Sequence, residues 1–231
     1  MIATVESVPQ ATCWTLIRAA AAGQSEQREE FTRRYLPAVR AYFGARWRTS
    51  PLRSEMDDAV QEVFVACFRE GGVLARARPE PGGFRAFLFG VIRNVALHLE
   101  RTRARRDRKQ EVGVADRDAP DEEPSASRAY DRAYARAVMQ EAARVMAARA
   151  QVAGTAARRR VEILRLRFQE GLPIREIARL WQCDAIELHR EHAKAAREFK
   201  SALRIVVGLS ERCAPDRLEQ ECKRLLDLLA G

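Results

Sequence analysis

Apolar residues recur at the spacing of an α-helix along almost the whole chain, and this period constrains the fold more than any other feature. Within residues 84–109, one side of such a helix carries Leu88, Val91, Ile92, Val95 and Leu99. No stretch shows the alternation of a β-strand, and no repeat of about 20–50 residues is present. Alanine and arginine, both strong helix formers, are abundant, whereas the 12 glycines and 9 prolines are clustered. The sequence therefore predicts an all-α protein.

Changes in composition divide the helical pattern into two small domains, predicted over residues 12–110 and 125–205. Between them, residues 111–124 (EVGVADRDAPDEEP) hold six acids against one arginine, two prolines and no apolar period. Such a segment predicts a flexible acidic linker. Residues 206–231 form a C-terminal helical extension whose apolar stripe consists of Leu218, Cys222, Leu225, Leu226 and Leu229. We expect this stripe to pack on the second domain; docking of a regulator and self-association are the alternatives.

The charge balance narrows the classes of partner. The 41 Lys and Arg exceed the 32 Asp and Glu, giving a net charge of +9 and a pI near 9.9. Most of the cations are arginine, which binds phosphate as a planar fork. This composition is typical of proteins that bind nucleic acid or an anionic surface. It is equally compatible with an arginine-rich protein that has no such partner.

Several classes of protein find no support in the sequence. The five cysteines include no C-x-x-C pair, which favours a reduced, cytoplasmic protein. We expect no signal peptide and no membrane insertion, because no apolar run is long enough. Cys183, His189 and His192 lack a fourth ligand and a standard zinc spacing. No phosphate-binding loop and no catalytic set of side chains appears, so we expect neither cofactor nor metal and no enzymatic activity.

The strongest local pattern, over residues 171–203, predicts a helix-turn-helix. Ile174, Ile177 and Ala178 would form the inner face of a short first helix, and residues 181–183 the turn. Asp184 can cap the second helix, with Glu187 three residues later completing a capping box.

The second helix of this pattern has two distinct faces. If Leu188 faces inward, the same side carries His192, Ala195, Phe199 and Leu203, and the opposite side carries Ile186, Arg190, Ala193, Lys194 and Arg197. Cations with small or apolar groups suit the phosphates, guanine edges and thymine methyls of a major groove. Arg175 and Arg179 of the first helix could contact the DNA backbone. The alternative is a helical hairpin with a solvated basic face.

Two further helices carry unusual surfaces. In DDAVQEVFVACF (residues 57–68), Val65 falls opposite the apolar face, among acids and a glutamine; Ser54 and Asp57 would cap this helix. In the helix from Phe84, a second stripe holds Phe87, Gly90, Asn94, Leu97 and Arg101. A ring, an amide and a guanidinium suit single-stranded DNA. The alternative is that Phe87 and Leu97 pack under a neighbouring helix.

These segments occur together and in order: DDAVQEVFVACF, a loop, FRAFLFGVIRNVA, a linker, then RRRVEILRLRFQEGLPIREIA and a second helix. The chain thus resembles the bacterial sigma factors of the sigma-70 family. With only a linker between the helical blocks, it resembles the extracytoplasmic-function type, over about residues 14–203. The resemblance implies a region 2 helical bundle over residues 12–110 and a region 4 helix-turn-helix over residues 125–205. It implies promoter-specific initiation and promoter melting, with core RNA polymerase and promoter DNA as partners, and an anti-sigma factor or other regulator as a further family expectation.

The resemblance also implies roles for individual residues. The helix that docks on the clamp of core polymerase carries Asp58, Gln61, Glu62 and Val65, with Val65 as an apolar anchor in a polar ring. The single-stranded −10 element would be held by Arg85, Phe87, Asn94 and Arg101, and the loop at residues 71–83 would capture a flipped base. The −35 element would be read by Arg175, Ile186, His189, Arg190, Ala193, Lys194 and Arg197.

The sequence also departs from the family pattern. Gln182 stands where glycine is common, and Glu187, Leu188 and His189 replace Thr-Val-Lys. The loss of that lysine and the gain of Glu187 and Glu191 remove positive charge from the end of the helix that would face the groove, so they bear on −35 affinity and sequence. Phe87 replaces a usual tryptophan.

Two other functions compete with a sigma factor. A helix-turn-helix regulator that binds duplex DNA without polymerase would need neither the surface around Val65 nor the stripe from Phe87 to Arg101. A helical adaptor that binds only proteins would show no DNA affinity at any salt concentration.

Overall fold

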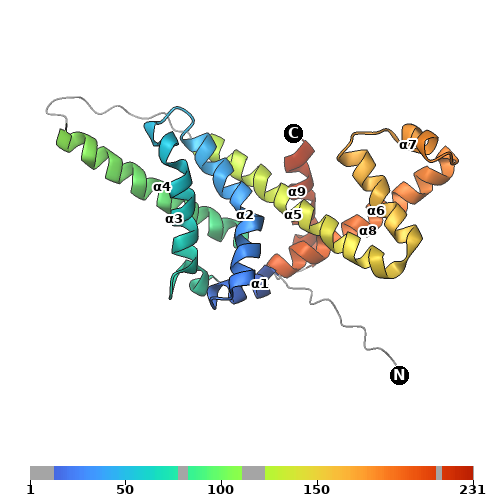
Figure 1. Cartoon of the computed structure of the whole chain (residues 1–231), viewed down its shortest axis with the longest axis horizontal. Helices are drawn as coiled ribbons and strands as arrows, with labels where there is room; N and C mark the ends of the chain where they lie inside the picture. The colour runs from blue at the N-terminus through green and yellow to red at the C-terminus, as the bar shows by residue number, and fades with distance from the viewer. Residues whose placement is uncertain (1–12, 78–82, 111–122, 212–214, 231) are drawn as a thin grey trace, which may run out of the picture. The chain divides into compact units, whose positions relative to one another are not determined.

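The computed structural model describes residues 13–77, 83–110, 123–211 and 215–230 (Figure 1). Every regular element within these ranges is a helix, which confirms the all-α prediction. The chain divides into two compact units, the first built mainly from residues up to Ala137 and the second mainly from Val138–Gly208. No helix in the described ranges has both the length and the apolar content that crossing a bilayer requires.

The first unit is a bundle of helices around an aromatic core. It contains α1 (Cys13–Ala21), α2 (Ser25–Arg46), the 3₁₀ helix η1 (Pro51–Glu55), α3 (Met56–Phe68), the 3₁₀ helix η2 (Val73–Arg76) and α4 (Gly83–Gln110). α2 packs with α1, α3 and α4, and α3 also packs with α4. Phe31 of α2 lies at the centre, with its ring centroid 6.3 Å from that of Phe64 and 5.8 Å from that of Phe84. Such edge-on contacts add to the gain from burying the rings.

Polar side chains of α2 fix the ends of its neighbours. Arg28 donates to the carbonyl oxygens of Ala20 (3.0 Å) and Phe68 (2.7 Å), close to the last residues of α1 and α3. These contacts satisfy carbonyl groups that have no partner within their own helix. At the other end of α2, Glu100 of α4 accepts hydrogen bonds from Arg46 (2.7 Å) and from the indole of Trp47 (2.8 Å). The orientation of α4 is therefore set by buried rings and by this polar contact.

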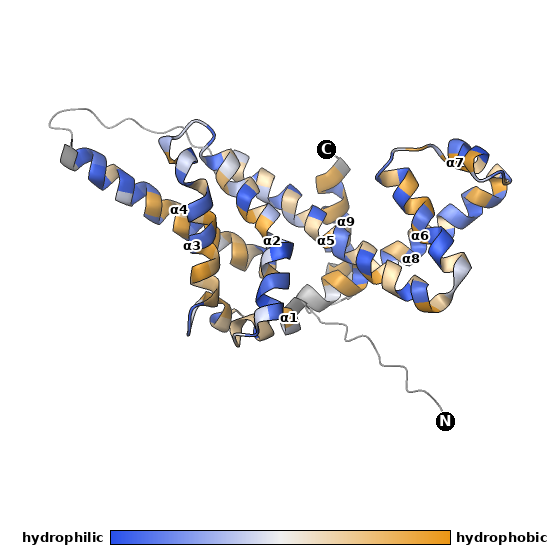
Figure 2. Cartoon of the chain, viewed as in Figure 1, coloured by the Kyte–Doolittle hydropathy of each residue, from blue (hydrophilic) through white to orange (hydrophobic). Residues whose placement is uncertain are grey.

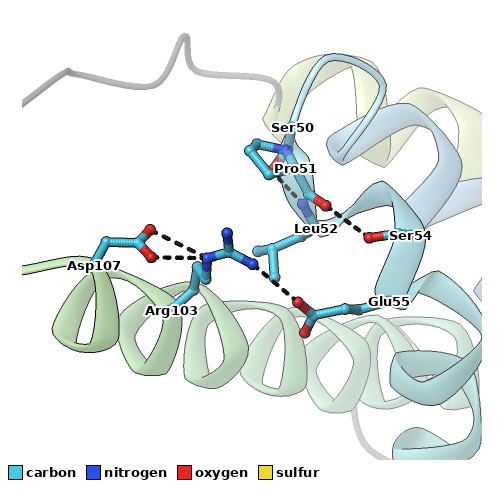
Figure 3. Close-up of polar contacts among 7 residues, drawn as sticks. All are labelled: Ser50, Pro51, Leu52, Ser54, Glu55, Arg103 and Asp107. Carbon is cyan, nitrogen blue, oxygen red and sulfur yellow. Dashed lines mark hydrogen bonds and ion pairs between the residues drawn. The ribbon is translucent and has the colours of Figure 1, made fainter. Parts of the chain in front are cut away.

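The entry into α3 differs from the predicted cap (Figure 3). Ser54 donates to the carbonyl oxygen of Pro51 (3.0 Å), and the N-cap residue of α3 is Glu55, which makes no side-chain capping bond. The predicted capping pair of Ser54 and Asp57 is therefore wrong. The reason is that the chain forms η1 first, capped by Ser50 through the amide of Leu52 (3.2 Å), so Ser54 lies inside a helical turn.

α5 (Glu123–Ala153) contributes its first half to the first unit. The buried side of this half carries Ala126, Tyr130, Ala133, Tyr134 and Ala137. The Tyr130 ring lies 5.4 Å from that of Phe89, and the Tyr134 ring stacks 6.0 Å from that of Tyr35. The division between the units thus falls inside α5, after Ala137, whereas composition placed it at residues 111–124. Of that segment, residues 111–122 lie outside the described ranges, and the last two residues belong to α5.

The second unit contains α6 (Thr155–Phe168), α7 (Ile174–Leu180) and most of α8 (Ala185–Glu211) and α9 (Pro215–Ala230). Its core at the α7–α8 corner is aliphatic and consists of Ile163, Leu166, Ile174, Ile177, Ala178 and Leu188. α9 lies against α8, because Glu219 pairs with Lys200 (3.1 Å) and with Arg204. Cys222 and Leu225 of its apolar stripe are buried, whereas Leu226 and Leu229 remain exposed.

Candidate polymerase-binding and DNA-binding surfaces

α3 separates a buried face from an exposed one. Its buried residues are Ala59, Val60, Val63, Phe64 and Cys67. Burial raises the pKa of the Cys67 thiol to about 12, so this cysteine remains an unreactive part of the core. On the other side, Asp58, Gln61 and Val65 are exposed and Glu62 is half-buried. The structure therefore gathers the four predicted polymerase contacts on one outward surface, which we call the α3 surface.

Val65 is the apolar residue of this otherwise polar surface. Its side chain is 55% exposed, and it is the one large hydrophobic side chain that is exposed among the described residues up to 110. Asp57, on the same helix, pairs with Arg40 of α2 (2.7 Å) while remaining 74% exposed. Val65 is thus a single apolar side chain surrounded by polar ones, an arrangement that also occurs at the centre of protein contacts.

α4 presents the predicted single-strand stripe on its surface. Asn94 and Arg101 are exposed, and Phe87 and Leu97 are half-buried. The Phe87 ring lies 5.8 Å from that of Phe84, which holds it at the edge of the aromatic core. A methyl group added at Gly90 would meet no atom within 4 Å, so the backbone there is open on its outer side. Towards its end α4 becomes mostly hydrophilic (Figure 2). All five residues of this set, which we call the α4 stripe (Phe87, Gly90, Asn94, Leu97 and Arg101), can thus be reached from solvent, and the Phe87 ring is held in place by the core.

Arg85 occupies a different environment. Its guanidinium pairs with Asp131 of α5 at 2.6 Å, and both side chains are only 16% exposed. Its carbonyl oxygen accepts a hydrogen bond from the hydroxyl of the buried Tyr130 (2.8 Å). A DNA contact through this guanidinium would have to replace the carboxylate of Asp131. Sequence spacing could not reveal this pair, because Asp131 follows the acidic segment and nothing in the periodicity links the two helices.

The loop predicted to capture a flipped base is described only in part. Residues 78–82 lie outside the described ranges. In the described part, Gly72 is closely surrounded: an added methyl group would lie 2.6 Å from the carbonyl oxygen of Arg69. Leu74 of η2 is buried. The start of this loop is therefore fixed against the end of α3.

The turn between α7 and α8 follows the sequence prediction. Asp184 accepts a hydrogen bond from the amide of Glu187 (2.8 Å), which confirms it as the cap of α8. Gln182 adopts φ 51°, the left-handed region that favours glycine. The glycine expected at this position from the family pattern therefore has a backbone reason. The ring of Trp181 lies under the guanidinium of Arg159, 4.8 Å from the centroid, and partly buries the turn.

The outer face of α8 carries the predicted groove contacts. Leu188 and Ala195 are buried, whereas Ile186, His189, Arg190, Ala193, Lys194 and Arg197 are all exposed. Arg175 of α7 is exposed as well. The structure therefore brings the predicted −35 contacts together on the surface of the α7–α8 pair.

Ion pairs balance some of the acids and cations on and beside the outer face of α8. Arg160 of α6 lies 3.3 Å from Glu191 and 2.9 Å from Glu198, and Lys194 lies 2.6 Å from Glu191. The hydrogen bond from Lys194, with that from Arg160, holds the pKa of the Glu191 carboxyl below its ordinary value. The negative charge of Glu191, which lowers the positive charge of the groove face, is therefore compensated by cations of the same unit. Arg160 was missed because its partners are more than 30 residues away.

His192 faces inward, as the period predicts. Its Nε2 is buried and has no hydrogen-bond partner among the described residues. Burial, helped by the nearby Arg167 guanidinium and by His189, lowers the pKa of this imidazole. Among the described residues, no three His, Cys, Asp or Glu side chains gather as metal ligands would.

A comparison with protein families matches one segment of the first unit. Residues 31–106, about a third of the chain, match the model of sigma-70 region 2. No significant match was found among curated proteins or among solved structures. The matched segment contains the whole α3 surface and the whole α4 stripe. Residues 31–106 are therefore similar to the part of sigma-70 factors that binds core RNA polymerase and promoter DNA during promoter-specific initiation of transcription.

Proposed function

We propose that this protein is a sigma factor of the extracytoplasmic-function type, in which two helical units divide promoter recognition. The observation that carries the proposal is the match of residues 31–106 to sigma-70 region 2, because both unusual surfaces of the first unit fall inside it. The exposed basic face of α8, in the second unit, supplies the second DNA contact. The chemistry of RNA synthesis belongs to the polymerase.

The α3 surface is the proposed contact with core polymerase. Val65 supplies apolar area, and Asp58 and Glu62 supply negative charge around it. An apolar anchor surrounded by polar groups excludes water from its contact and selects a partner by charge. Acids at this position repel the DNA backbone, so the partner that fits is a protein surface with basic groups.

The α4 stripe is the proposed contact with the melted −10 element. Phe87 offers a ring on which a base can stack, Asn94 offers an amide to a base edge, and Arg101 offers a cation to a phosphate. Binding of the separated strands, and not of the duplex, stabilises the melted state and so assists opening.

The α7–α8 pair is the proposed contact with the −35 element. α8 would enter the major groove with Arg190 and Arg197 towards it, and Arg175 would contact the backbone. When one polymerase carries both units, the second contact forms at high effective concentration. Neither contact needs high affinity alone, and binding should weaken steeply as salt rises.

The test uses the full chain and purified core polymerase. We expect the chain to be retained on immobilised core polymerase, and the complex to make run-off transcripts with defined starts from fragments enriched by the protein. Retention without DNA binding would indicate a protein adaptor, and duplex binding without retention would indicate a helix-turn-helix regulator. Either result would replace the proposal.

A further inference from the structure

Ile186 has no role in the fold that its surroundings reveal. It lies in the first turn of α8, its side chain is 66% exposed, and it is absent from the aliphatic core of the α7–α8 corner. A β-branched residue is also a poor choice for an exposed helical position, because the helix restricts its rotamers. The side chain therefore costs the protein some stability where it stands, which favours a role in contact with a ligand.

The position of Ile186 on α8 identifies its neighbours. Counting by helical spacing, Ile186, Arg190, Ala193 and Arg197 form one row, opposite the buried Leu188. All four residues of this row are exposed. Ala193 carries a single methyl group between two long cations. The only large apolar group of the row is thus at its first position, one helical turn before Arg190.

The charged residues around this row favour a polyanion as its ligand. Among the described residues, Arg190 and Arg197 take part in no ion pair, whereas the flanking acids Glu191 and Glu198 are held by Arg160. Glu187, which is also exposed in the first turn of α8, is the acid near the row that is not paired with Arg160. A protein partner for an exposed isoleucine would have to tolerate two free guanidinium groups. Duplex DNA uses both kinds of group, since its major groove offers guanine acceptors and the methyl group of thymine.

We infer that Ile186 is a specificity-determining residue that contacts the 5-methyl group of a thymine in the major groove. The inference rests on the proposed binding of the −35 duplex by α8. Four residues of helix advance about 6 Å, and base pairs are about 3.4 Å apart, so the thymine lies within about two base pairs of the position that Arg190 contacts. The recognised element therefore contains a thymine whose methyl group, and not only its hydrogen-bonding edge, contributes to affinity.

The test replaces single thymines by deoxyuridine, which removes the methyl group and leaves the hydrogen-bonding groups. The probes are duplexes retained from a randomised library by the full chain bound to core polymerase. We expect one upstream position at which this replacement weakens binding about 3–5-fold, the loss that one buried methyl group produces. With Ile186→Ala, thymine and deoxyuridine should bind alike at that position.

Leu180→Ala is the matched control, because Leu180 of α7 is 64% exposed and lies outside the row. This variant should keep the preference for thymine. If binding to the duplex depends on salt but no thymine replacement changes it, the inference is wrong and the proposed function stands. If Ile186→Ala reduces retention on polymerase and leaves the thymine preference intact, Ile186 contacts protein. If no duplex is retained even at low salt, both the inference and the proposed −35 contact fail.

Discussion

Val65 and Ile186 present the same anomaly in opposite surroundings. Each is a β-branched side chain on the exposed face of a helix, 55% exposed in α3 and 66% exposed in α8. Asp58 and Glu62 lie beside Val65, whereas Arg190 and Arg197 share the face of Ile186. We propose that each of the two side chains makes a contact outside its unit. The sign of the neighbouring charges decides what that partner can be: a basic protein surface for one, a polyanion for the other.

The largest expected effect is on the first of these surfaces. Val65→Asp should abolish retention of the chain on core polymerase, because it places a charge in the centre of the contact. The fold should be unaffected, since the side chain is exposed, and thermal unfolding followed by circular dichroism checks this. Ile186→Asp is the matched change on α8 and should leave retention normal. Normal retention of the Val65→Asp variant would show that the α3 surface is not the contact with core polymerase.

The second effect concerns the basic row. Arg190→Ala combined with Arg197→Ala should weaken binding of the upstream duplex about 10–100-fold and reduce the salt dependence by about two charges. Retention on polymerase should not change. Lys194→Ala is the control, and it should have a smaller effect because Lys194 already pairs with Glu191. Unchanged footprints in the double variant would show that this face does not enter the groove.

A third, smaller effect separates a structural role of Arg85 from a DNA-binding one. Asp131→Asn should lower the free energy of unfolding by about 2 kcal/mol, because a charged partner 2.6 Å away in a mostly dry contact is lost. Asp107→Asn, in the more exposed pair with Arg103, should cost about 0.5 kcal/mol or less, as measured by urea unfolding. Tighter binding of single-stranded DNA by Asp131→Asn would instead mean that Asp131 competes with DNA for Arg85.

The smallest effect is expected in the turn before α8. Gln182→Gly should raise the free energy of unfolding by about 0.5–1 kcal/mol, because φ 51° strains a residue with a side chain. Gln169→Gly, at φ −93°, provides the same substitution without relief of strain and should be neutral or destabilising. Equal urea midpoints for the two variants would contradict this account.

Much of the candidate site could be predicted from local pattern. The exposed position of Val65, the inner face of α8 and the cap at Asp184 all follow from helical periodicity or from spacings of a few residues. The predicted cap at Ser54 failed because a 3₁₀ turn precedes α3, and two helical turns in succession offer two possible starts. Periodicity gives the face of a helix reliably and its first residue less so.

The sequence by itself determined that the chain is helical, which side chains face outward, and that valine and isoleucine lie where a fold does not need them. Only the tertiary structure decided which charged side chains form ion pairs and to which unit the first half of α5 belongs. Arg85 is held by Asp131, Glu191 is compensated by Arg160, and the first half of α5 completes the aromatic core of the first unit. The reason is physical: helical faces follow from repeats of three and four residues, whereas ion pairs between helices depend on distances between segments that no local pattern encodes.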